Sequence, residues 1–262
     1  MARVPLRRMF GPFLAFALRA PLQDERWRQK VLVGGLLSLL PNLALLLAVF
    51  MALGKVSRML APVAVVFFVF PTVVSWGYVY RVFVDALNGL EFRRLPQWSD
   101  WLSYAGVGIR LGVIYLGYLF LVGLGALAVM AVFGLFPPGA DPTRLSAVTL
   151  LAIGAAMMLY GLLPIVFARF AAERKIWASF DPGAILSDLG RAFRGGRYTQ
   201  ACLGFYLCFG LLLLLNLILG AVPPVAMFVG SIGSFYLMVV FAWVFGWLIG
   251  IRGSDSPSAG AR

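Results

Sequence analysis

The sequence contains few residues that could carry out acid–base, metal or redox chemistry. Its 262 residues include no histidine, which excludes histidine general-base catalysis and the imidazole ligands that haem, zinc and most non-haem iron sites use. The two cysteines, Cys202 and Cys208, both lie inside an apolar run. Cysteines in that setting are more often small core residues than metal ligands or a disulfide. We therefore expect neither a metal nor a cofactor.

Two aspartates are the best candidates for a catalytic acid or base. Asp100 lies between Trp98 and Trp101, and Asp181 precedes Pro182. An aspartate at such a position is far more often the N-cap of a helix, because its carboxylate accepts hydrogen bonds from N–H groups of the first turn. We therefore expect that the protein is not an enzyme and that Asp181 begins a short amphipathic helix.

The composition places these residues in a membrane protein. Hydrophobic residues make up 62% of the chain and charged residues 12%, whereas an ordinary soluble domain has about 45–50% and about 25%. Lipid must cover the apolar surface that a soluble fold of this size could not bury. The net charge of +12 is spread between the apolar runs, which is typical of segments beside anionic lipid headgroups and not of a nucleic-acid-binding surface.

Five windows without any charged residue predict the helices that cross the membrane. They are residues 31–54, 59–80, 111–140, 145–168 and 198–251, and about 20 apolar residues suffice for one span. The last window is long enough for two spans, and Pro223-Pro224 near its middle predicts a tight hairpin. The sequence therefore predicts an all-α fold with six transmembrane helices in three hairpins, near residues 31–53, 60–80, 111–133, 147–168, 200–222 and 225–251.

The basic residues predict the orientation in the membrane. If the connections alternate between sides, all but three of the 22 Lys and Arg residues fall on one side, which the positive-inside rule assigns to the cytoplasm. Both termini are then cytoplasmic, with a basic amphipathic segment at 1–30, the membrane domain at 31–251 and a tail at 252–262. A cleavable signal peptide is the alternative for the first segment, because residues 15–17 resemble a cleavage site. The short apolar part favours an uncleaved segment.

Charged pairs recur where three predicted spans leave the membrane on the cytoplasmic side. Arg81 and Asp85 follow one span, Arg169 and Glu173 follow another, and the more closely spaced Arg252 and Asp255 follow the last. Residues four apart lie on one face of a helix, so each of the first two pairs predicts a helix that continues past the membrane. The recurrence is consistent with a threefold internal repeat, and a generic membrane-interface composition is the alternative.

Aromatic and small residues predict further contacts. Trp98, Trp101 and Tyr104 are amphipathic rings that we expect at the level of the lipid headgroups. Gly246-x-x-x-Gly250 places two small residues on one helix face. This spacing lets two backbones approach closely, and it favours packing within the chain over a dimer interface.

Several of these residues also carry a resemblance to a known family. The matching segments are Asp24-Glu25-x-Trp27, Lys30 to Gly35, Gly77-Tyr78-x-x-Arg81, Leu95-Pro96-x-Trp98-x-Asp100-Trp101, Ala168 to Glu173 and Phe180-Asp181. Over about residues 20–250 the chain resembles the uncharacterised prokaryotic membrane protein family "domain of unknown function 4013". The resemblance implies a multi-pass protein of the prokaryotic cytoplasmic (inner) membrane with amphipathic helices in its cytoplasmic loops. It implies no activity.

These observations favour a function based on contacts. We expect a non-catalytic membrane scaffold or accessory subunit of a larger complex, which contacts anionic lipid headgroups and other membrane protein subunits through its cytoplasmic loops. The alternative is a small-solute or lipid transporter with a cavity lined by Asn42, Thr72 or Asn216. The residues expected to make the contacts are Arg81, Asp85, Pro96, Trp98, Asp100, Trp101, Arg169, Glu173 and Asp181.

Overall fold

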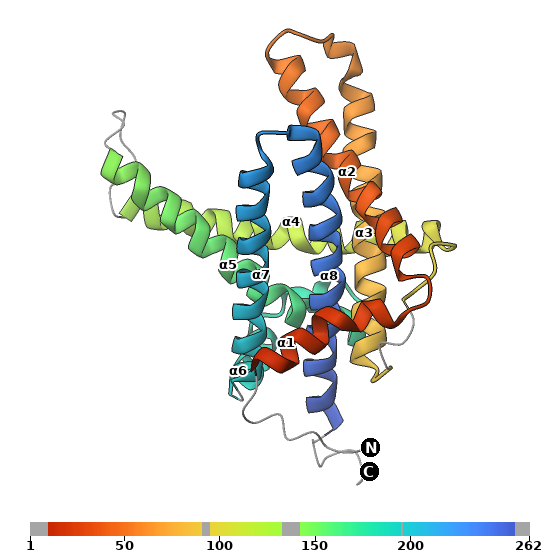
Figure 1. Ribbon diagram of the computed structural model, residues 1–262. Coiled ribbons are helices and arrows are strands. Elements are labelled where there is room, and N and C mark those ends of the chain that lie inside the picture. The colour runs from red at the N-terminus through yellow and green to blue at the C-terminus, as the bar shows by residue number, and fades with distance from the viewer. Residues whose placement is uncertain (1–9, 91–94, 133–141, 195, 255–262) are drawn as a thin grey trace. The chain divides into compact units, whose positions relative to one another are not determined.

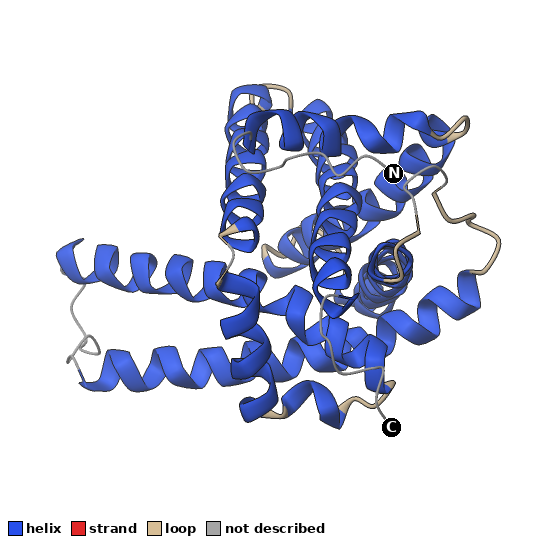
Figure 2. Ribbon diagram, turned by 90° about the horizontal axis from the view of Figure 1, so that it is seen from below, coloured by secondary structure: helices blue, strands red, loops and turns tan. Residues whose placement is uncertain are grey.

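The computed structural model describes residues 10–90, 95–132, 142–194 and 196–254, and every regular element in these ranges is a helix (Figures 1 and 2). The all-α prediction is therefore confirmed for this part of the chain. The α-helices are α1 Phe10–Arg19, α2 Trp27–Ala52, α3 Ala61–Leu87, α4 Trp101–Val132, α5 Pro142–Glu173, α6 Pro182–Phe193, α7 Arg197–Leu219 and α8 Pro223–Ser254. Three short 3-10 helices join them, namely η1 Ala20–Gln23, η2 Arg58–Leu60 and η3 Trp177–Phe180.

Five helices in the described ranges are long and apolar enough to cross a membrane. They are Trp27–Ala52, Arg58–Leu87, Trp101–Val132, Arg197–Leu219 and Pro223–Gly250. These helices contain five of the six predicted spans except for a few residues at the span ends. One of those residues, 133, lies outside the described ranges. The remaining predicted span, 147–168, falls within α5, which is not among the five. The chain is thus a helical protein of the membrane type, with five of its six predicted spans supported by length and composition.

The chain divides into two compact units. The first comprises Met1–Ile109 with Arg191–Arg262, and the second comprises Arg110–Gly190. In the first unit α2, α3 and α8 pack against one another, and α7 packs beside α8 (Figure 1). Its core contains large side chains that are almost fully buried, including Tyr78, Tyr198, Phe235 and Phe241.

Glycines allow α8 to approach α3 closely. A methyl group at Gly246 would collide with the carbonyl oxygen of Phe83, and one at Gly250 would collide with the carbonyl oxygen of Leu87. These obstacles are backbone atoms, so no side-chain rotation could relieve the collision. The Gly246-x-x-x-Gly250 pattern therefore serves packing within the chain, as predicted.

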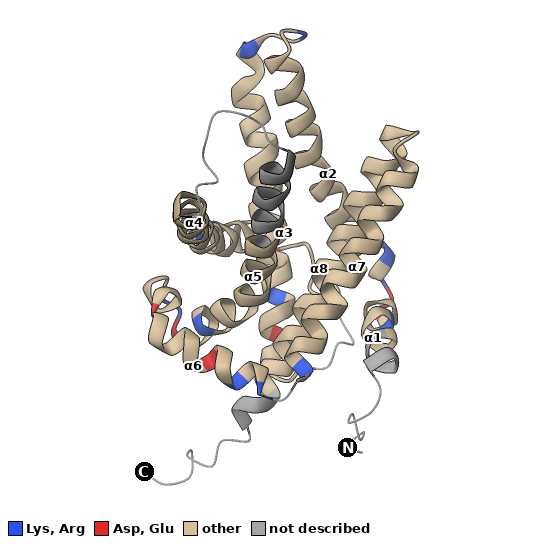
Figure 3. Ribbon diagram, turned by 90° about the vertical axis from the view of Figure 1, so that its left-hand side faces the viewer, with Lys and Arg blue, Asp and Glu red and all other residues tan. Residues whose placement is uncertain are grey.

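The first unit separates charge from apolar surface along its helices. Charged residues lie at the ends of α2, α3, α7 and α8, and the middle of each helix carries none (Figure 3). Between α2 and α3, the turn before η2 holds Lys55 and η2 holds Arg58, and the turn between α7 and α8 holds no charge. All other charged residues of these four helices lie at their opposite ends. α3 has 27 residues, or about 40 Å of helix, so its charged end extends beyond a hydrocarbon core of about 30 Å.

The N-terminal segment at 1–30 contains the helix α1. It packs against α8, where the hydroxyl of Tyr236 donates to the carbonyl oxygen of Leu18 and the ring of Phe16 lies 6.3 Å from that of Trp243. Three of the basic residues predicted for this segment, Arg3, Arg7 and Arg8, lie outside the described residues. The predicted tail at 252–262 lies outside them from residue 255 onward.

Candidate functional site

A buried ion pair holds the connection between α3 and α4 in place. The carboxylate of Asp24, just after η1, accepts hydrogen bonds from Lys30 Nζ at 2.8 Å and from the backbone nitrogen of Leu95 at 2.7 Å. Lys30 Nζ also donates to the carbonyl oxygen of Leu95 at 2.6 Å. The side chains of Asp24 and Lys30 are only 6% and 13% exposed. We call this set of contacts the Asp24 cluster, and it ties residues that are up to 71 positions apart in the sequence.

Hydrogen bonding sets the charge state of Asp24. Burial alone would raise its pKa, because a low-dielectric surrounding disfavours the charged carboxylate. The hydrogen bond from Lys30, those from the backbone nitrogens of Arg26 and Leu95, and the charge of Lys30 together outweigh burial and hold the pKa of Asp24 below its ordinary value of 3.8. The cluster is therefore a stabilised ion pair near neutral pH.

Aromatic rings fix the same connection from its other side. The ring of Trp98 stacks on Tyr78 of α3 with centroids 4.0 Å apart and planes 9° apart. Trp98 Nε1 donates to the carbonyl oxygen of Lys30 at 2.9 Å, and the Tyr78 hydroxyl donates to the carbonyl oxygen of Pro96 at 3.1 Å. The indole of Trp98, which we expected among lipid headgroups, is therefore engaged within the protein.

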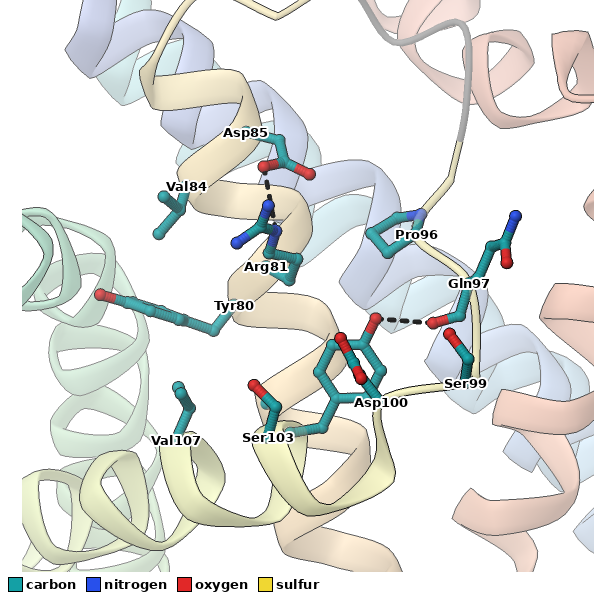
Figure 4. Close-up of a pocket in the computed structure, with 12 residues that line it drawn as sticks. Tyr80, Arg81, Val84, Asp85, Pro96, Gln97, Ser99, Asp100, Ser103 and Val107 are labelled. Carbon is teal, nitrogen blue, oxygen red and sulfur yellow. Dashed lines mark hydrogen bonds and ion pairs between the residues drawn. The ribbon is translucent and has the colours of Figure 1, made fainter.

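This arrangement leaves a polar cleft of about 420 Å³ beside the end of α3 (Figure 4). We call it the Arg81 cleft. Its walls come from three consecutive parts of the chain: the last turns of α3, the connection that follows and the first turns of α4. Its lining residues are Gly77, Tyr80, Arg81, Val84, Asp85, Pro96, Gln97, Ser99, Asp100, Ser103, Tyr104 and Val107.

The charged groups that line the cleft are Arg81, Asp85 and Asp100. Arg81 Nε pairs with Asp85 Oδ1 at 3.2 Å, as their spacing predicted. The Tyr104 hydroxyl donates to the carbonyl oxygen of Gln97 at 2.6 Å and is within electrostatic reach of Arg81, Asp85 and Asp100. The backbone nitrogen of Tyr104 donates to the carbonyl oxygen of Asp100 at 3.0 Å, which makes Asp100 the N-terminal cap residue of α4.

The cleft offers groups that can bind a polar ligand. It offers one guanidinium, two carboxylates and hydroxyl groups, which can form ion pairs and hydrogen bonds with a polar ligand. Among the described residues, no group of three or more His, Cys, Asp or Glu side chains is placed to hold a metal ion. A second polar cleft, of about 570 Å³, is lined by residues of the Gln23–Lys30 segment and by Val33, Gln97, Trp98 and Ser99.

The structure brings six of the nine predicted contact residues together in the first unit. Arg81, Asp85, Pro96 and Asp100 line the Arg81 cleft. Trp98 lines the second cleft, and the ring of Trp101 lies 5.4 Å from that of Trp98. The motif Leu95-Pro96-x-Trp98-x-Asp100-Trp101 therefore has a structural explanation: Leu95, Pro96 and Trp98 attach the connection to the helices, and Asp100 lines the Arg81 cleft.

The other three predicted residues, Arg169, Glu173 and Asp181, lie in the second unit. Arg169 pairs with Glu173 at 3.5 Å, as predicted, and also with Asp188 at 2.7 Å, which connects the end of α5 to α6. Asp181 Oδ1 accepts a hydrogen bond from the backbone nitrogen of Ala184 at 3.1 Å. Asp181 is thus the N-cap of α6, as predicted.

The second unit repeats the chemistry that holds Trp98. The ring of Tyr118 on α4 stacks on Phe180 of η3 with centroids 5.2 Å apart and planes 12° apart. Its hydroxyl donates to the carbonyl oxygen of Ser179 at 2.5 Å. In each unit a tyrosine of a long helix stacks on a ring in a connecting segment and hydrogen-bonds to the backbone of that segment.

Three residues that organise the site were not predicted as contact residues: Asp24, Lys30 and Tyr78. All three belong to segments that carry the resemblance to the family, and this resemblance is the sequence signal that could have identified them. Their partners could not be inferred from spacing, because Leu95 lies 71 residues from Asp24 and Pro96 lies 18 residues from Tyr78. Sequence spacing identifies neighbours only within one helix.

Replacing Tyr78 by phenylalanine tests the attachment of the connection. The change removes the hydrogen bond to the Pro96 carbonyl oxygen and keeps the stacking on Trp98. We expect the free energy of unfolding to fall by about 1 kcal/mol, because the net contribution of one intramolecular hydrogen bond to stability is about that large. Thermal unfolding in detergent measures it, and Tyr118→Phe is the matched variant in the second unit. An unchanged melting temperature for Tyr78→Phe would show that the bond contributes nothing.

Comparison with known proteins gives one match. A family model described as "Protein of unknown function (DUF4013)" matches residues 60–223. No curated protein and no solved structure matches the chain. The matched range begins at the N-terminal end of α3 and contains the Arg81 cleft and the whole second unit.

Proposed function

The chain belongs to the DUF4013 family, and on that premise we propose that it is a non-catalytic membrane scaffold or accessory subunit of a larger membrane complex. Its cytoplasmic side contacts lipid headgroups or partner proteins. The observation that carries the proposal is the Arg81 cleft. The Asp24 cluster and the Leu95–Trp101 motif hold polar groups together there, at the end of α3. Because buried contacts hold this surface cleft in a defined shape, a binding role is favoured for it.

The distribution of charge supports a cytoplasmic position for the cleft. We propose six spans in three hairpins, with both termini in the cytoplasm of a prokaryotic cell and the domain in its inner membrane. In the first unit, the end of α3 that carries Arg81 is opposite the turn before η2. The positive-inside rule assigns the more basic end to the cytoplasm. The short helices α1 and α6 are then helices of the cytoplasmic interface.

The proposal of a non-catalytic role is supported by the environments of the candidate acids. Asp181 caps α6 with its side chain, and the backbone carbonyl oxygen of Asp100 accepts the first helical hydrogen bond of α4. Aspartate is favoured at helix starts without a catalytic role. The chain also lacks the histidine that most often acts as a general base.

A transporter is less well supported than a binding role. Asn42 Nδ2, a proposed cavity group, donates to Ser231 Oγ at 3.0 Å and so joins α2 to α8. Thr72 Oγ1 donates to the carbonyl oxygen of Phe68 at 2.5 Å, and Asn216 Nδ2 donates to that of Leu212 at 2.9 Å. These bonds satisfy polar groups within the helices and between them, and neither described cleft is lined by these three residues.

Purification from native membranes in mild detergent tests the proposed function. We expect the full-length chain to retain defined lipids or partner proteins, which mass spectrometry can identify. Arg58→Ala, at the opposite end of α3 from the cleft, is a control that should leave these species unchanged. A chain that always purifies alone, with neither lipid nor protein, would contradict the scaffold role.

A further inference from the structure

The balance of charge in the Arg81 cleft differs from that of the whole chain. The chain carries a net charge of +12, which favours anionic lipid surfaces in general. The cleft carries one cation, Arg81, and two carboxylates, those of Asp85 and Asp100. All three side chains line the same cleft (Figure 4). A purely anionic headgroup would meet more negative than positive charge there.

The geometry of Arg81 leaves part of its guanidinium for a ligand. Its ion pair with Asp85 uses Nε, and its side chain is 63% exposed. The two Nη groups can therefore donate to an anion such as a phosphate, for which the planar guanidinium is well suited. An exposed ion pair of this kind contributes only about 0–1 kcal/mol, so a ligand can reorganise it at little cost.

The other wall of the cleft is suited to an ammonium group with N–H donors. Asp85 and Asp100 supply carboxylate acceptors, and Ser99 and Ser103 supply hydroxyl oxygens. A primary ammonium has three donors for such acceptors. A trimethylammonium group has none and is usually recognised by a cage of aromatic rings.

The rim of the cleft suits a lipid better than a water-soluble molecule. Leu102 is not part of the lining, but it directly precedes the lining residue Ser103 on the first turn of α4 and is 88% exposed. The cleft also lies where α3 passes from its uncharged stretch to its charged end. A lipid bound there could place its headgroup in the cleft and its acyl chains along the apolar part of the helices.

We propose that the Arg81 cleft binds the headgroup of an aminophospholipid that carries a primary ammonium, such as phosphatidylethanolamine. The phosphate lies on the Nη groups of Arg81, and the ammonium lies between the carboxylates of Asp85 and Asp100. This assignment rests on the proposed function and specifies the lipid that the cytoplasmic side selects.

The test measures lipid selectivity on the purified full-length chain after removal of bound lipid. The chain is titrated with short-chain phosphatidylethanolamine, phosphatidylcholine and phosphatidylglycerol, and native mass spectrometry counts bound lipids. We expect phosphatidylethanolamine to bind about tenfold more tightly than the other two lipids, because only its primary ammonium can form charge-assisted hydrogen bonds with the carboxylates. Asp100→Asn should abolish this preference.

The controls separate the lost charge from a lost fold. Asn caps a helix about as well as Asp, so Asp100→Asn should keep α4 intact and the protein monodisperse. Asp181→Asn makes the same change at another helix start and should keep the selectivity. A loss of selectivity in both variants would overturn the assignment to the cleft.

Other outcomes identify which proposal fails. Equal binding of the ethanolamine and choline lipids, a preference for phosphatidylglycerol, or full selectivity in Asp100→Asn would overturn the aminophospholipid assignment. Free phosphoethanolamine that binds as tightly as the lipid would overturn the lipid as the ligand. In each case, lipids or proteins retained from native membranes would still support the scaffold role. Only their absence would contradict both proposals.

Discussion

Replacing Asp24 by alanine is expected to lower the free energy of unfolding by about 3–5 kcal/mol, because removal of one partner leaves the other charge buried and unpaired. Lys30 would keep only the Leu95 carbonyl oxygen from the Asp24 cluster, and the backbone nitrogen of Leu95 would lose its acceptor. In a chain of this size the change corresponds to a fall in melting temperature on the order of 10 °C. Thermal unfolding in detergent at neutral pH measures it.

The effect of Asp24→Ala should depend on pH in a defined direction. The pKa of Asp24 is held below 3.8 in the folded protein, so its charged form is stabilised by folding. The stabilisation is fully present above the ordinary carboxyl pKa and is lost as the pH falls through the lower folded value. The difference in melting temperature between wild type and variant should therefore be constant near neutral pH and should begin to narrow only below pH 3.8.

Asp85→Ala is the matched control for the Asp24 cluster. It also removes an aspartate from an ion pair, but Arg81 and Asp85 are 63% and 29% exposed. Exposed pairs contribute about 0–1 kcal/mol, so this variant should melt close to the wild type. Equal losses for Asp24→Ala and Asp85→Ala would show that burial of the Asp24 cluster has no special role in holding the connection.

The second large effect is expected for Gly77→Ala, at the crossing of α3 and α4. A methyl group at Gly77 would collide with the carbonyl oxygen, the carbonyl carbon and the Cα of Tyr104. Overpacking costs about 1–3 kcal/mol or more, and these backbone atoms cannot rotate away, so we expect the upper end of that range. The first turns of α4 should separate from α3, and the Arg81 cleft should lose its shape. Size-exclusion chromatography and thermal unfolding report this as aggregation and a lower melting temperature.

Gly106→Ala makes the same change on α4 where the structure has room. No atom outside the local helix lies within 4 Å of the position that the methyl group would take. Alanine is favoured over glycine in a helix by up to about 1 kcal/mol, so this variant should be as stable as the wild type or slightly more stable. A Gly106→Ala protein as unstable as Gly77→Ala would contradict the close approach at Gly77.

The features that the sequence predicted correctly depend on neighbours in the chain. Windows without charge located the long helices, because a helix in lipid excludes charged side chains over about 20 residues. The ion pair of Arg81 with Asp85 and the cap at Asp181 also follow from separations of three or four residues. Local geometry of this kind is the same in every helix.

The features that the sequence could not predict depend on distant contacts. Nothing in the sequence around Asp24 and Lys30 indicates that both side chains bind the backbone of Leu95. Trp98 has the composition of an interface residue, but a tyrosine of α3 and a carbonyl oxygen of α2 engage its ring and its N–H group. The Arg81 cleft exists only because these contacts fold the connection back, so its outline could not be derived from spacing.

The central claim is that the Arg81 cleft is the surface through which this protein retains lipids or partners. Ser103→Trp tests it most directly, because Ser103 is exposed and lines the cleft, so a bulky side chain there fills it. Ser187→Trp, at an exposed position of α6, is the matched control. The measurement is the inventory of lipids and proteins that each full-length chain retains from native membranes. We predict that Ser103→Trp loses species that the wild type and Ser187→Trp retain, and an inventory unchanged by Ser103→Trp would contradict the claim.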